Sequence, residues 1–317
     1  KSINSSKTES ARCAVKENKL RPVQQIVFDE VMKAIDSGVV PWRSQFLPCL
    51  PYNGVSKKEY CGINLILLAL RPFPSAEFLT FKQVNDLGGK VIEGSKSNLV
   101  VFYKAYKKES KSKESDQLDV FGDGDNTMQD TKTRYVLRYY RVFNISQTTL
   151  WTDEKKAAAK LEAQESNEVD ERCQSIVDGM PNAPAVSYAP LHHPCYIPAA
   201  DTVKMPIKEQ YETREAFYTT LFHELTHSTG HVSRLDRFRD NDLHSAAFGS
   251  RQYSQEELVA EMGAAFLAAR AGILQPQIDN MAAYINGWRS KLTNDPQALF
   301  KAAADAQRAF DYIVQSQ

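Results

Sequence analysis

The sequence contains the stretch Phe222-His223-Glu224-Leu225-Thr226-His227-Ser228-Thr229-Gly230-His231, in which Glu224 stands within a His-Glu-x-x-His pattern. Residues four apart in an α-helix lie on the same face, so the side chains of His223 and His227 can bind one metal ion. Glu224 lies about 100° further round the helix. There its carboxylate can take a proton from a metal-bound water and pass it to a leaving group. The stretch therefore predicts a metal site with His223 and His227 as ligands and Glu224 as the catalytic base, a pattern typical of zinc hydrolases.

The surroundings of this pattern favour a helix. Residues 213–229 contain neither proline nor glycine, and apolar residues recur through them. Gly230 follows, and glycine is typical of the position where a helix ends. The alternative is a surface helix that carries the pattern by chance. However, three of the six histidines of the chain lie within residues 223–231, and this concentration favours a metal site.

A zinc site of this kind takes a third protein ligand and leaves the fourth position to water. A histidine six residues after His227 would complete the metzincin pattern, but that position is Ser233. His231 follows the glycine at which the helix is expected to end. A second helix is therefore the better source of the third ligand.

Such a helix is predicted from Ser254 onward, where Glu257 and Glu261 are again four residues apart. We expect Glu257 to be the third ligand and Glu261 to hold a ligating histidine in place, with Glu261 as the alternative ligand. Two other interpretations stay open: Ser254 and Glu257 have the spacing of a helix capping box, and Glu261 can be a solvated helix charge. We expect Zn²⁺ in the site, with another divalent metal such as Mn²⁺ as the alternative.

The composition is that of an ordinary globular protein, with 317 residues of which 42% are hydrophobic and 25% charged. This length predicts two domains. No apolar run reaches the length of a membrane span, so we expect no membrane partner and no signal peptide. The five cysteines are scattered and form no CxxC pair, which is typical of free thiols in a reducing compartment. We therefore expect a cytoplasmic protein.

The net charge of zero hides a difference between the two halves of the chain. Residues 1–150 hold 23 Lys and Arg against 16 Asp and Glu, whereas residues 151–317 hold 16 against 23. A basic half suggests nucleic acid as its partner. The alternative is that this modest excess of positive charge serves no binding partner, since many domains that bind no nucleic acid have a similar excess.

Basic residues alternate with aromatic rings in the first half of the chain. Stacking rings combined with phosphate-binding cations are typical of proteins that bind single-stranded nucleic acid. The alternative is that most of these rings fill the core. The candidate DNA-binding residues of this kind are Trp42, Tyr52, Lys57, Lys58, Tyr60, Arg138 and Arg141.

Hydrophobic periodicity predicts helices over residues 22–37, 281–292 and 295–314, and strands over 98–103, 135–145, 195–197 and 202–205. Residues 104–134 are polar and balanced in charge, which predicts a mobile hairpin insertion.

The expected fold class is α+β with two domains. A small mixed α/β DNA-binding domain covers residues 1–150, and a mostly helical domain with a short sheet covers residues 181–317. Residues 151–180 form a helical linker, with a helix over residues 152–177 that is rich in Ala, Glu and Lys.

The chain resembles the ArdC-type antirestriction proteins of plasmids and other mobile elements over about residues 20–315. The N-terminal half looks like their single-stranded-DNA-binding domain in the segments Pro41-Trp42, Tyr60-Cys61-Gly62-Ile63-Asn64, Thr80-Phe81-Lys82-Gln83, Leu87-Gly88-Gly89 and Val100-Val101-Phe102-Tyr103. The C-terminal half is similar to their zincin-like metallopeptidase domain in residues 196–206, His223-Glu224-x-x-His227-x-Thr229-Gly230-His231, Arg234-Leu235, Glu256-Glu257-Leu258-x-Ala260-Glu261, Ala283-Tyr284 and Ala304-Asp305-Ala306-Gln307.

This resemblance implies that the first half binds single-stranded DNA, and it adds Asn64 to the candidate DNA-binding residues. It also implies a metal-dependent peptidase fold, acting on an unknown protein or peptide, and the protection of incoming DNA from host restriction. A second hypothesis is a binding protein that shields DNA and whose metal site is structural and not proteolytic. A third is a replication accessory such as a primase fragment, against which stands the lack of a polymerase-like acidic cluster in the sequence.

Overall fold

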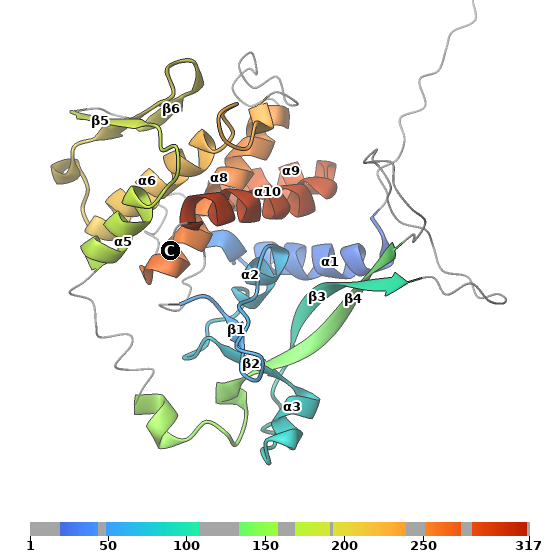
Figure 1. Cartoon of the computed structure of the whole chain (residues 1–317). Helices are drawn as coiled ribbons and strands as arrows, with labels where there is room; N and C mark the ends of the chain where they lie inside the picture. The colour runs from blue at the N-terminus through green and yellow to red at the C-terminus, as the bar shows by residue number, and fades with distance from the viewer. Residues whose placement is uncertain are drawn as a thin grey trace, which may run out of the picture.

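The computed structural model describes residues 20–43, 49–107, 133–157, 169–190, 193–238, 251–273 and 281–315. Helices from both halves of the chain meet between two separate sheets (Figure 1). The expected α+β class is confirmed. Within the described ranges, no helix is long and apolar enough to span a membrane.

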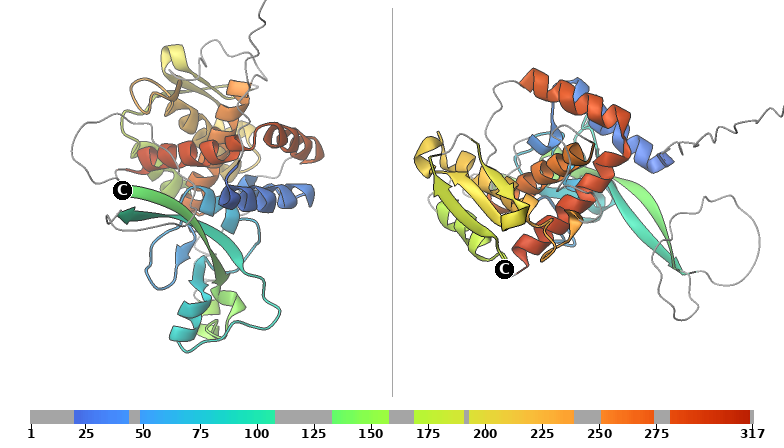
Figure 2. Two further views of the ribbon diagram at one scale, coloured as in Figure 1. Left: turned by 90° about the vertical axis from the view of Figure 1, so that its right-hand side faces the viewer. Right: turned by 90° about the horizontal axis from the view of Figure 1, so that it is seen from above.

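A four-stranded sheet in the order β1-β2-β4-β3 forms the base of the N-terminal half. β4 pairs antiparallel with β2 on one side and with β3 on the other, whereas β1 runs parallel to β2. β3 and β4 extend beyond the rest of the sheet as a two-stranded ribbon (Figure 2). The four strands are β1 (Tyr52–Asn53), β2 (Glu77–Thr80), β3 (Asn98–Lys107) and β4 (Thr133–Asn144).

The ribbon is longer than the sequence predicts, because its strands continue into both ends of the expected insertion over residues 104–134. Lys107 pairs with Thr133 at the end of the ribbon. The rest of the insertion, residues 108–132, lies outside the described ranges, so its mobility stays a prediction.

Helices α1 (Pro22–Asp36) and α2 (Ile63–Leu68) lie against this sheet. Proline at the first position of α1 suits a helix start, where its missing N–H has no intrahelical partner. The helix ends before Gly38, which has a φ of +88° that favours glycine. α1 buries a stripe of side chains spaced four residues apart, namely Val27, Val31 and Ile35.

A three-stranded sheet in the order β5-β7-β6 belongs to the C-terminal half, with β5 (Ala185–Ala189), β6 (Cys195–Ile197) and β7 (Thr202–Pro206). β6 and β7 form an antiparallel hairpin whose turn contains Asp201 at a φ of +45°. Arg234 is 1% exposed in its side chain and forms an ion pair with Asp201. This pair ties the hairpin to the segment that follows the helix with His223 and His227.

The remaining elements are the helices α3 (Phe81–Asp86), α5 (Val169–Asp178), α6 (Arg214–Ser228), α8 (Arg251–Ala271), α9 (Met281–Asn294) and α10 (Gln297–Val314), and the 3-10 turns η1 (Pro41–Arg43), η2 (Ile145–Gln147), η4 (Pro198–Ala200) and η5 (Lys208–Gln210). Of the predicted linker helix, residues 153–157 are helical, α5 covers its end, and residues 158–168 lie outside the described ranges. The domain bounds 1–150, 151–180 and 181–317 stay predictions.

α6 and α8 approach each other closely at Gly263. A Cβ atom at this position would lie 2.4 Å from Cγ2 of Thr226 on α6. Only glycine leaves room for the two helices at this separation. The close packing brings the side chains of α8 to the histidine-bearing face of α6.

The two halves share one hydrophobic core. The ring of Trp42, in the 3-10 turn η1, is 0% exposed and meets Trp288 of α9 edge to face at 5.8 Å. Its indole Nε1 donates a hydrogen bond to the hydroxyl of Tyr284 at 3.0 Å. The backbone N–H of Gly62, before α2, donates to Oε1 of Gln307 on α10 at 2.6 Å. The halves are therefore joined by packed side chains as well as by the linker.

Candidate metal centre

α6 carries the histidines and begins at Thr213, whose hydroxyl accepts a hydrogen bond from the backbone N–H of Ala216 at 3.1 Å. Such a cap satisfies an N–H group that has no partner within the helix. The helix then runs without interruption to Ser228. His223 and His227 consequently lie one turn apart, as the sequence predicts.

Three candidate ligand atoms converge between α6 and α8. Nε2 of His223 and Nε2 of His227 lie 3.1 Å apart. The two carboxylate oxygens of Glu257 lie 3.6 Å from these nitrogens, one from each. One donor atom from each residue falls within 4.8 Å of the others. Two imidazoles and one carboxylate are a donor set that suits a divalent metal and leaves a coordination position open.

Glu256 supports the metal site from the side away from the ligand atoms. Its Oε1 lies 3.3 Å from Nδ1 of His227. When a metal is bound, a carboxylate that accepts the proton on Nδ1 fixes the tautomer in which Nε2 is the ligand atom. Arg237 in turn donates two hydrogen bonds to Glu256, from Nη2 at 2.7 Å and from Nε at 3.3 Å. Both side chains are 6% exposed.

The same arginine connects this arrangement to the end of α6. Nη1 of Arg237 donates to Oγ1 of Thr229 at 2.6 Å, and Nη2 donates to the carbonyl oxygen of Thr226 at 3.1 Å. Arg237 thus fixes the orientation of Glu256 relative to the helix that carries His227. Neither role is predicted from the sequence, although Glu256 stands directly beside the predicted ligand Glu257.

Acidic groups dominate the electrostatics of the centre. Burial alone would lower the pKa of His227, but the hydrogen bond to Glu256 and the charges of Glu224 and Glu257 raise it to about 9. Burial would raise the pKa of Glu257, but the contacts with His223 and His227 outweigh burial and lower it to about 2. A group of carboxylates this close together attracts a cation to the site.

Glu224 is 5% exposed and lies beside the metal-ligand group on α6. Its negative charge contributes to the raised pKa values of Cys195, Tyr211 and Tyr253, after the larger effect of burial in each case. These residues come from β6 and from the segments before α6 and at the start of α8. The Glu224 carboxylate is therefore within electrostatic range of groups from three different segments.

Tyr253 at the start of α8 is a further residue of the centre. Burial, the charge of Glu257 and a hydrogen bond to that carboxylate raise the pKa of Tyr253 to about 12. The phenol consequently stays protonated and donates a hydrogen bond to the carboxylate of Glu257. This contact helps to hold the third candidate ligand in place.

Glu261 is directed elsewhere. Its Oε2 accepts a hydrogen bond from Nε of Arg43 at 3.0 Å and another from the hydroxyl of Tyr284. The convergent group contains Glu257 and does not contain Glu261. The supporting contact with a histidine that we expected from Glu261 is made by Glu256. His231 lies beyond α6, with Nδ1 2.8 Å from the hydroxyl of Ser233.

Three of the candidate DNA-binding residues are buried, which corrects their assignment. Trp42 is 0%, Tyr60 5% and Asn64 5% exposed. The two rings pack in the core, so neither offers a face to a base. The amide of Asn64 bonds to both the backbone N–H and the carbonyl of Val101, at 2.7 and 2.9 Å. These residues hold the fold of the N-terminal half together.

The other five candidates remain accessible to a ligand. Lys57 and Lys58 are exposed, and Nζ of Lys57 lies 5.3 Å from the ring centroid of the half-buried Tyr52. Arg138 and Arg141 are exposed on β4. Three rings that the sequence analysis left unassigned are also exposed on β3 and β4, namely Phe102 at 45%, Tyr139 at 47% and Tyr140 at 43%. The run Tyr139-Tyr140-Arg141 was the available signal.

Comparisons with known proteins match both halves of the chain. Residues 21–143 match the family model of the N-terminal domain of anti-restriction factor ArdC, and residues 184–305 match that of a zincin-like metallopeptidase. The chain is 30% identical over 304 residues to the DNA primase TraC of Escherichia coli. That match covers 93% of this chain but only 20% of the length of the primase.

The fold is similar to that of the antirestriction ArdC protein from R388 plasmid. The metal-free structure of that protein gives a TM-score of 0.68 at 28% identity, covering 93% of this chain and 98% of that chain. The Mn(II)-bound structure gives 0.65 at 27% identity with the same coverage. The order of the two matched domains is the order in ArdC-type proteins. The chain therefore belongs to the ArdC-type antirestriction family, with an ArdC N-terminal domain followed by a zincin-like metallopeptidase domain.

Proposed function

We propose that this chain is an antirestriction protein that binds single-stranded DNA through its N-terminal half and hydrolyses peptide bonds at a Zn²⁺ centre between α6 and α8. The observation that carries the peptidase proposal is the convergence of His223, His227 and Glu257 on one point, with the buried Glu224 beside them. A metal site that is purely structural has no need of a free carboxylate next to its ligands.

The donor set also favours a divalent metal, and the related ArdC protein from R388 plasmid has a Mn(II)-bound structure. Two imidazole nitrogens and one carboxylate fit Zn²⁺, with Mn²⁺ as the alternative. When bound, the metal supplies a Lewis acid that polarises the scissile carbonyl and lowers the pKa of a coordinated water.

The residues of the chain supply the other parts of the reaction. Glu224 accepts a proton from the attacking water and passes it to the amine leaving group. His227 is held in one tautomer by Glu256, and Tyr253 holds Glu257. These contacts fix the ligands before the substrate arrives, so little reorganisation is needed during the reaction. The substrate is an as yet unidentified protein or peptide.

The DNA-binding part of the proposal rests on the N-terminal domain and its surface. The domain match is to the anti-restriction factor ArdC, and the relative TraC is a DNA primase. Exposed rings and a cation lie on one face of the β3–β4 ribbon, where Phe102 is paired with Arg138 and its ring lies 5.8 Å from that of Tyr140. This combination suits stacked bases and backbone phosphates. DNA bound in this way is protected from host restriction. Because incoming DNA meets restriction enzymes in the cytoplasm, the protein acts there.

The variant Glu224→Gln tests the proposal. It should keep the metal and DNA binding but reduce peptidolysis at least 100-fold, since a carboxamide is a poor proton acceptor. Glu212→Gln removes the same charge from an exposed position outside the centre and serves as the control. Antirestriction that survives Glu224→Gln unchanged would favour the hypothesis of a DNA-shielding protein with a structural metal site.

A further inference from the structure

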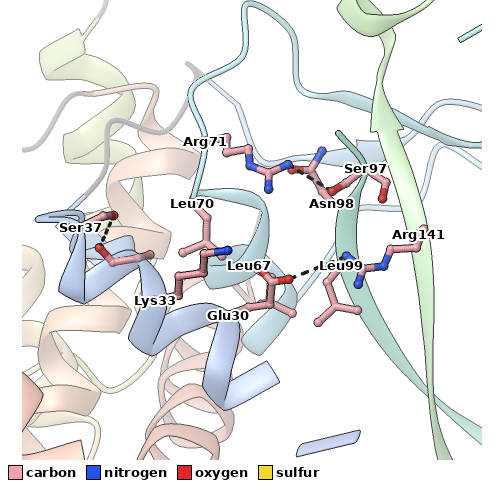
Figure 3. Close-up of a pocket in the computed structure, with 11 residues that line it drawn as sticks. Glu30, Lys33, Ser37, Leu67, Leu70, Arg71, Ser97, Asn98, Leu99 and Arg141 are labelled. Carbon is pink, nitrogen blue, oxygen red and sulfur yellow. Dashed lines mark hydrogen bonds and ion pairs between the residues drawn. The ribbon is translucent and has the colours of Figure 1, made fainter. Parts of the chain in front are cut away.

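A pocket of about 190 Å³ lies in the N-terminal half between α1, α2 and the β3–β4 ribbon. Figure 3 shows side chains from all of these elements directed around it. The volume is sufficient for a group of several non-hydrogen atoms. Its polar lining includes Glu30, Lys33, Ser37, Arg71, Asn98 and Arg141.

The charged groups of the pocket are mostly cationic. Lys33, Arg71 and Arg141 line the pocket together with one carboxylate, that of Glu30. Nη1 of Arg141 lies 3.9 Å from Oε1 of Glu30, which is too far for a hydrogen bond. In the part of the chain that the structure describes, Lys33 has neither an ion pair nor a side-chain hydrogen bond. The pocket therefore carries an excess of positive charge that its own residues leave uncompensated.

Arg71 is held in place by the backbone rather than by an acid. Its Nη1 donates to the carbonyl oxygens of Ser97 at 3.1 Å and Lys96 at 3.4 Å. Both bonds use the same nitrogen, so the other guanidinium N–H groups stay available to a ligand. A guanidinium anchored in this way is already oriented, and little side-chain entropy is lost when an anion binds.

A buried polar group at the pocket wall also lacks a partner. Asn98 is 4% exposed, and its Nδ2 forms no hydrogen bond with the other described residues. Leaving a buried donor unpaired costs free energy, and a ligand or an ordered water removes that cost. The unpaired amide belongs to a residue of the same pocket wall and is an observation independent of the three cations.

We propose that this pocket is a phosphate-binding site. A phosphate group combines negative charge with several acceptor oxygens, and it fits both the guanidinium donors and a point charge such as that of Lys33. The phosphate comes either from the backbone of single-stranded DNA or from a free nucleotide. If the phosphate belongs to DNA, the inference rests on the proposed DNA binding. It then means that one backbone phosphate is bound on the helix-covered side of the ribbon.

The test compares ligands and variants by fluorescence anisotropy and calorimetry. The ligands are oligothymidylate, the same oligomer with uncharged methylphosphonate linkages, and thymidine monophosphate. Lys33→Gln should weaken phosphate binding about tenfold. It should also lower the number of counterions released on DNA binding, read from the slope of log affinity against log salt concentration, by about one. Glu30→Gln should tighten phosphate binding several-fold, because it removes the carboxylate that competes for the cations. Lys301→Gln, at an exposed position of α10, is the charge-matched control and should change neither.

The outcomes separate this inference from the proposed function. If wild type, Lys33→Gln and Glu30→Gln bind oligothymidylate with equal affinity, the pocket is not a phosphate site. The proposal of DNA binding would still stand. A chain that ignores oligothymidylate but binds thymidine monophosphate in a Lys33-dependent way would sink the DNA proposal and keep the pocket as a nucleotide site. No response of either ligand would overturn both. Opposite effects of Lys33→Gln and Glu30→Gln would support the site, because a purely structural role predicts no gain from Glu30→Gln.

Discussion

Arg43 and Glu261 form an ion pair between the two halves of the chain, with Nε of Arg43 3.0 Å from Oε2 of Glu261. Glu261 lies one turn after Glu257 on α8, so the helix that supplies a candidate metal ligand also holds the N-terminal half. The two side chains are 21% and 10% exposed. The pair therefore connects the position of α8 to the packing of both domains.

Arg43→Ala should destabilise the protein by about 2 kcal/mol, because it leaves the Glu261 carboxylate poorly solvated and without its cation. The urea midpoint of unfolding measures this effect. Arg289→Ala breaks the exposed pair with Asp36, whose side chains are 57% and 49% exposed, and should cost less than about 1 kcal/mol. Both pairs join the two halves, so equal losses in the two variants would show that the partial burial of the Arg43–Glu261 pair adds nothing to its contribution.

Gly263→Ala should separate α6 from α8, since its Cβ would lie 2.4 Å from Cγ2 of Thr226. We expect a loss of about 1–3 kcal/mol in stability and weaker metal binding, as Glu257 moves away from the histidines. Thr226→Ala in the same chain should restore part of both. Gly287→Ala on α9 meets no atom within 4 Å and should stabilise the helix by up to about 1 kcal/mol.

Glu256→Gln should weaken metal binding about 10- to 100-fold, because His227 loses the carboxylate that orients its ring. Titration with Zn²⁺ against a competing chelator gives the affinity. Glu261→Gln, which changes a carboxylate on the same helix without touching a histidine, is the control. An unchanged affinity for Glu256→Gln would mean that the ring of His227 is positioned by packing alone.

Metal content should be one divalent ion per chain in the wild type and should be lost in His223→Ala and Glu257→Ala but kept in Glu261→Ala. Elemental analysis of the purified proteins decides this. Chelation should also lower the thermal midpoint of the wild type, since a ligand of the folded state stabilises it. Loss of the metal in Glu261→Ala alone would exchange the roles of the two carboxylates.

Stability should fall in acid partly through the ion pair between Asp201 and Arg234. Burial would raise the pKa of Asp201, but the hydrogen bonds from Arg234 and Tyr196 outweigh it and lower the pKa below the ordinary 3.8. A carboxyl group with a depressed folded-state pKa stabilises the fold above its unfolded pKa, and this contribution is lost as the pH falls through the folded-state value. Urea midpoints between neutral pH and pH 3 measure it, and Asp201→Asn should flatten the acid side of the curve.

The histidine pair was predictable because the spacing of His223 and His227 fixes their relation within one helix. The third ligand depends on how two helices pack, so the sequence left Glu257 and Glu261 as alternatives. Their separation by one turn did not reveal that one carboxylate meets the histidines and the other meets Arg43. Glu256 was missed because its role depends on Arg237, which reaches it from a different segment.

The candidate DNA-binding residues were harder to assign from sequence. Trp42 and Tyr60 have the same residue types as stacking rings, and only the tertiary structure shows that they are buried. The exposed rings at Phe102, Tyr139 and Tyr140 lie on strands whose pattern predicts burial on one side. Tyr139 and Tyr140 pair with the buried Val101 and Val100, so which rings stay exposed depends on how the helices pack on the sheet.

The burial of Trp42 against Trp288 and Tyr284 means that neither half of the chain is structurally self-sufficient. A recombinant half of this chain, on either side of the linker, would expose apolar surface that the other half normally covers. A substitution in one half is therefore tolerated only when it keeps the surface that packs against the other half.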